Sequence, residues 1–114
     1  MFDGLSAVSL YRQLEALDNS LSKIKSDDVT SQFLAAYMNQ GSFNHILKQV
    51  REQAADAPEY LKSFSHIEPA EIPKGADRGA YPKFLAKVQM LKQAVGAFIE
   101  LAMSSEQKRQ IGFR

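Results

Sequence analysis

Apolar residues recur at helical spacing along most of the chain, and the longest such pattern runs from Tyr81 to Met103. On a wheel of about 100° per residue, the opposite side of this stretch is polar, and lysines flank the apolar stripe. Pro82 suits a first helical turn because it has no N–H to satisfy. The pattern predicts one long helix over 81–104 with a single apolar stripe, formed by Phe84, Val88, Leu91, Val95, Phe98, Ile99 and Ala102.

A second helix is predicted over 6–25, where leucines follow a repeat typical of a coiled-coil seam. The spacing is 4, 3, 4, 3 through Leu10, Leu14, Leu17, Leu21 and Ile24. Two heptads are too few for a free coiled coil, so two uses remain open. The seam packs inside an intramolecular bundle against the long helix, or it joins copies of the chain. Leu10, Leu14, Leu17 and Leu21 are therefore candidate residues of an interaction seam.

Two shorter helices are predicted between these, over 28–39 and 43–56. Asp28 ends a short polar run that can cap the first of them, because its carboxylate accepts from free N–H groups. Gly41 then predicts a stop, since glycine is the residue that most often follows a helix C-terminus. A short helix over 58–64 follows.

The stretch 65–80 contains too many helix-breaking residues for a regular element. We expect an irregular crossing segment, anchored by Ile67 and Ile72, and connections of this length are either mobile or functional. The predicted class is therefore all-α: a single-domain bundle of four main helices and one short helix. The breakers are Pro69, Pro73, Gly75 and Gly79.

Composition removes several kinds of chemistry from consideration. The 114 residues include no cysteine, which excludes disulfides and thiolate sites and agrees with a reducing, cytoplasmic location. No apolar run approaches the length of a membrane span, so we expect no membrane partner. The two histidines lie far apart, and no phosphate-loop, dinucleotide or His-Glu-x-x-His motif occurs. We expect no enzymatic activity, no metal and no cofactor.

The net charge of +1 hides an asymmetry along the chain. Residues 1–73 carry six basic and ten acidic side chains, whereas 74–114 carry eight basic and three acidic ones. Either the two halves attract each other, or the basic half binds an anionic partner. The strongest candidate for an anion or nucleic-acid site is the junction that precedes and opens the long helix, where helix N–H groups favour a negative charge. Its residues are Lys74, Arg78, Lys83 and Lys87.

These patterns predict a non-enzymatic module for protein–protein interaction, oligomerisation or other assembly, or a regulatory domain of a larger protein. The partner would be another protein or a second copy of the chain. The alternative is a small protein that binds nucleic acid or another anion through Lys74 to Lys92. The tail 105–114 ends in apolar Ile111 and Phe113, which is compatible with a following domain or with a basic tail.

Overall fold

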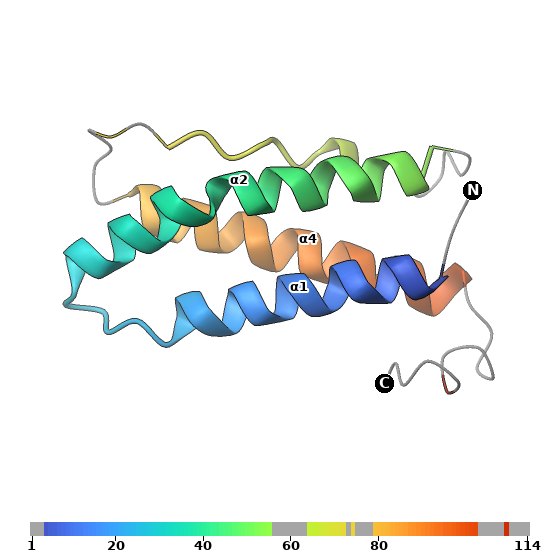
Figure 1. The fold of residues 1–114 in the computed structure, drawn as a ribbon, viewed down its shortest axis with the longest axis horizontal. Helices are drawn as coiled ribbons and strands as arrows, with labels where there is room; N and C mark the ends of the chain where they lie inside the picture. The colour runs from blue at the N-terminus through green and yellow to red at the C-terminus, as the bar shows by residue number, and fades with distance from the viewer. Residues whose placement is uncertain (1–3, 56–63, 73, 75–78, 103–108, 110–114) are drawn as a thin grey trace.

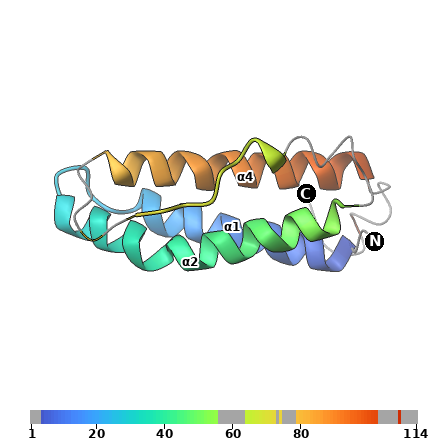
Figure 2. The same ribbon diagram turned by 90° about the horizontal axis from the view of Figure 1, so that it is seen from above.

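The computed structural model describes residues 4–55, 64–72, 74, 79–102 and 109. Within them lie three helices, α1 (Gly4–Ser22), α2 (Val29–Gln53) and α4 (Ala80–Ala102), and no strand. The all-helical class is confirmed. Helix α1 runs antiparallel to both α2 and α4, so the three form an elongated bundle (Figure 1, Figure 2).

The predicted stop at Gly41 is wrong, because one helix of 25 residues, α2, runs through Gly41 in place of the two helices predicted over 28–39 and 43–56. Asp28 is its N-cap, as predicted, and accepts from the Ser31 N–H at 3.1 Å. A glycine inside a helix costs only about 1 kcal/mol relative to alanine. The core contacts of Ala36 before it and Phe43 after it outweigh that cost, since both side chains are fully buried. The described residues therefore hold three main helices instead of four.

The other predicted elements are placed only in part. The short helix expected over 58–64 lies outside the described residues except for Phe64, and the tail 105–114 does so except for Arg109. The long helix begins at Ala80, one residue before the predicted start.

The core forms where the apolar stripe of α4 meets α1 and α2. The stripe residues from Phe84 to Ile99 are buried, and two pairs of aromatic rings connect separate parts of the chain. Phe43 of α2 meets Phe84 edge to face with ring centroids 5.7 Å apart. Phe64 meets Phe98 in the same way at 5.8 Å. Edge-to-face pairs add to the energy of simple burial.

Residues 64–72, here called the strap, return along the bundle beside α2 and α4 (Figure 1, Figure 2). The predicted anchors Ile67 and Ile72 are buried, so the sequence identified how this irregular segment attaches. Polar side chains of α2 hold its backbone as well. Gln40 accepts from the Ile72 N–H at 2.8 Å and donates to the Ile72 carbonyl at 3.2 Å. Asn44 makes the same two bonds to Ala70, at 2.7 and 2.8 Å.

Replacing Gly41 with alanine should stabilise the fold by about 0.5–1 kcal/mol, because alanine loses less backbone entropy in a helix. A Cβ at Gly41 would have no atom within 4 Å, so no clash opposes the gain. Urea unfolding at low micromolar protein concentration measures the change. Gly96→Ala is the matched control, since its Cβ would lie 3.2 Å from the Tyr11 ring. If alanine raised the free energy of unfolding equally at both positions, the open space around Gly41 would not explain its gain.

Candidate interaction surface

The outer face of the first half of α2 carries large apolar side chains that nothing in the described structure covers. Leu34 is 48% exposed and Met38 is 75% exposed. Phe33 and Tyr37, next to them, are half-buried, and their rings stack with centroids 5.9 Å apart. Leu34 and Met38 face away from the core, because they lie about 160° around the helix from the fully buried Ala36. The first turns of α2 also extend beyond the ends of α1 and α4 (Figure 1, Figure 2).

The same part of α2 carries no charge. The nineteen residues from Val29 to Leu47 contain no Asp, Glu, Lys or Arg. A solvated helix face normally carries charges, whereas the cores of protein interfaces are depleted of charge and enriched in aromatic residues and methionine. This neutral run is the feature that the sequence analysis missed. A helix stop at Gly41 divides it in two, and charge summed over halves of the chain conceals it.

The exposed residues of α2 form a ridge with seam-like spacing. Leu34, Met38, Gly41 and His45 are separated by 4, 3 and 4 residues and all are exposed. This set, here called the outer ridge, lies on one line along the helix surface. Lys48 and then Glu52 continue the line at the same spacing. The four residues of the outer ridge thus include no Asp, Glu, Lys or Arg, whereas the two residues that continue its line are both charged.

The leucines proposed as an interaction seam lie in the core of this structure. Leu10, Leu14, Leu17 and Leu21 are between 0% and 9% exposed. Their apolar surface packs within the chain, which corresponds to the intramolecular alternative. An interaction with another chain therefore has to use a different surface of this fold.

The structure describes three of the four residues of the proposed anion site. Lys74 and Lys83 are exposed, and Arg78 lies outside the described residues. Lys87 donates from Nζ to the Pro69 carbonyl at 3.0 Å, so its ammonium group helps to hold the strap. The two histidines, His45 and His66, are exposed. Among the described residues, no group of three or more side chains could hold a metal ion.

A partly buried ion pair joins the acidic N-terminal part of the sequence to the basic C-terminal part. Lys92 of α4 donates to Asp18 of α1 at 2.9 Å, and Gln89 and Ser22 each donate to the same carboxylate at 3.1 Å. Burial raises the pKa of Asp18, but these hydrogen bonds and the Lys92 charge outweigh it, so the pKa is lowered. The hydrogen bond to Asp18 raises the pKa of Lys92. Here the two halves do attract each other.

This ion pair gives a pH-dependent stability. The pKa of Asp18 is lower in the folded state than in the unfolded state, where it is about 4. The ion pair therefore contributes its full stabilisation of the fold above about pH 4, and this contribution is lost as the pH falls through the lower, folded-state pKa. Asp18→Asn should therefore cost about 1–2 kcal/mol at pH 7, and the difference from the wild type should shrink below about pH 4. Urea unfolding at several pH values measures both. A difference that stays constant with pH would show that the charge of Asp18 is not responsible.

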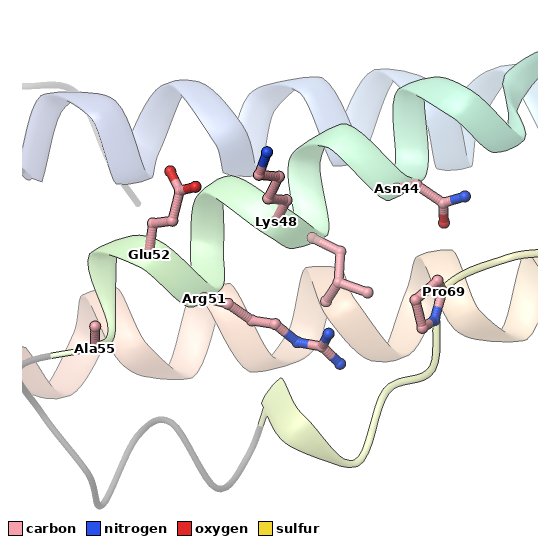
Figure 3. A pocket seen from close by; sticks show the side chains of 7 residues that line it. Asn44, Lys48, Arg51, Glu52, Ala55 and Pro69 are labelled. Atoms are coloured by element: carbon pink, nitrogen blue, oxygen red, sulfur yellow. The ribbon is translucent and has the colours of Figure 1, made fainter.

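A shallow hollow of about 420 Å³ lies between α2 and the strap (Figure 3). Arg51 extends from α2 toward the strap and donates to the Ile67 carbonyl at 2.6 Å. Asn44 and Pro69 line the same hollow, with Lys48 and Glu52 at its edge. Asn44 and Arg51 both bond to the strap backbone here, so these two side chains join the strap to α2 across the hollow.

The chain has no match among protein-family models, curated proteins or solved structures. In the described part of the chain, none of the helices has the length and apolar character needed to cross a membrane.

Proposed function

We propose that this chain is a non-enzymatic module for protein–protein interaction or assembly, and that it acts through the outer face of the first half of α2. The observation that carries this proposal is the exposure of Leu34 and Met38 within a helical run that has no charged residue. Exposed apolar patches on otherwise polar proteins mark sites of association. Methionine and aromatic neighbours are the side chains that such sites favour.

The surface chemistry supports a protein partner more than a nucleic acid. Phosphate contacts need Lys or Arg, and the outer ridge has none between Leu34 and His45. Of the basic candidates that the structure describes, Lys87 is bonded to the strap, and Lys74 and Lys83 are exposed cations. Binding of nucleic acid remains a prediction from the sequence. Titration with labelled single strands and duplex at low salt tests it, and no binding there would contradict it.

The proposed function is tested with the wild type and the double variant Leu34→Glu, Met38→Glu. Size-exclusion chromatography with light scattering reports self-association over a range of concentrations. Affinity capture from a lysate of the organism of origin reports other proteins. We expect the wild type to associate in one of these assays and the double variant to lose that association, with unchanged circular dichroism. A wild type that stays monomeric and captures nothing that depends on these residues would overturn the proposal.

A further inference from the structure

We propose that the outer ridge of α2 binds a second copy of itself, so that two chains pair through antiparallel α2 helices. This inference rests on the proposed function and names its partner. In a pair related by a two-fold axis, the same surface serves both chains and must be complementary to itself. The outer ridge meets that requirement in shape and in charge.

The shape argument follows from the 4, 3, 4 spacing of the ridge. In an antiparallel seam, Leu34 lies opposite His45 of the other copy, and Met38 lies opposite Gly41 of the other copy. Among the described residues, Met38 is the most exposed large apolar side chain, and Gly41 offers open space where a Cβ would meet no atom within 4 Å. The most exposed side chain of the ridge, Met38, therefore lies opposite its smallest residue, Gly41, and the two-fold axis repeats this contact once more in the pair.

The charge argument follows from the neutral run. Two identical charged surfaces repel each other wherever like charges meet, but nineteen uncharged residues from Val29 to Leu47 avoid this at the centre of the pair. At each end, the same alignment places Lys48 of one copy opposite the uncharged Ser31 of the other copy. It places Asp28 opposite Arg51 and Glu52 opposite Asp27, so attraction and repulsion both occur there. The neutral centre therefore carries the charge argument.

The experiment uses single-cysteine variants, because the chain contains no cysteine of its own. In the antiparallel pair, Met38 and its copy are offset by only about 4–5 Å along the helix, whereas Glu52 and its copy are offset by about 38 Å. Met38→Cys, Glu52→Cys and Met90→Cys are each treated with a short bismaleimide crosslinker. Met90 is the matched control, since it is an exposed methionine (51%) on α4. The concentration is chosen from light scattering of the wild type.

We expect Met38→Cys to form covalent dimer at least about tenfold faster than the other two variants, because pairing raises the local concentration of its partner thiol. Equal linking of Met38→Cys and Glu52→Cys would mean parallel helices and would overturn the inference. Equal crosslinking of all three cysteine variants would mean that the chains meet by random collision, and this result would also overturn the inference. A dimer by light scattering without preferential linking at Met38, or a monomer at every concentration, would also overturn it.

These results separate the inference from the proposed function. A dimer that Leu34→Glu, Met38→Glu abolishes but that Met38→Cys does not link would leave the function standing with a different geometry. A monomer whose capture of another protein depends on Leu34 and Met38 would leave it standing with a different partner. Only the loss of both forms of association removes the proposed function.

Discussion

Replacing Phe98 with alanine is expected to lower the free energy of unfolding by about 3–5 kcal/mol. Phe98 is 4% exposed and its ring meets the fully buried Phe64 edge to face at 5.8 Å. Truncation removes the burial of the ring, leaves a cavity, and removes one half of the contact that attaches the strap to α4. Such a loss is a large share of the stability of an ordinary small domain.

Urea unfolding followed by circular dichroism measures this loss at a fixed protein concentration. Met90→Ala is the matched control on the same helix, because Met90 is 51% exposed and should cost well under 1 kcal/mol. If Phe98→Ala cost no more than Met90→Ala, the Phe98 ring would not lie in the core as described.

Asn44→Ala is expected to lower the free energy of unfolding by about 2–3 kcal/mol, since it removes two hydrogen bonds at once. The Asn44 amide accepts from the Ala70 N–H at 2.7 Å and donates to the Ala70 carbonyl at 2.8 Å. The Ala70 side chain is buried, so its backbone groups gain little from water when Asn44 is removed. The strap would then lose the contact at its centre.

The control for this variant is Ser42→Ala, at an exposed position of α2 outside the outer ridge, which should change stability by no more than about 0.5 kcal/mol. Hydrogen exchange supplies a second readout. We expect the Ala70 amide to lose protection in Asn44→Ala while amides in the middle of α1 keep theirs. Unchanged protection at Ala70 would mean that Asn44 does not hold the strap.

Helical periodicity predicted much of the fold, because each helix has an apolar stripe whose spacing depends only on local geometry. The stripe from Phe84 to Ile99, the seam from Leu10 to Leu21, and the anchors Ile67 and Ile72 are all buried. Gly41 shows where local rules fail. Its preference for a helix end is worth about 1 kcal/mol, less than the burial of Ala36 and Phe43 on either side of it.

The candidate surface was harder to predict than the core. An apolar residue on a helix belongs to the core or to an interface, and periodicity alone does not separate the two. The spacing of the leucine seam left both uses open, and the structure shows that the seam packs within the chain. Leu34 and Met38 lie within the helix predicted over 28–39, and both are exposed.

The sequence by itself determined the all-helical class, the presence of α1 and α4, the irregular strap and the absence of thiol chemistry, since these depend on spacing and composition. It placed the end of the first helix at residue 25, three residues beyond the observed end at Ser22. Only the tertiary structure decided that α2 is continuous, that Gln40 and Asn44 hold the strap backbone, and that Asp18 pairs with Lys92. Each of these depends on contacts between residues distant in the chain. The exposure of Leu34 and Met38 belongs to the same class, because the packing of α2 on the rest of the bundle determines which of its sides remains uncovered.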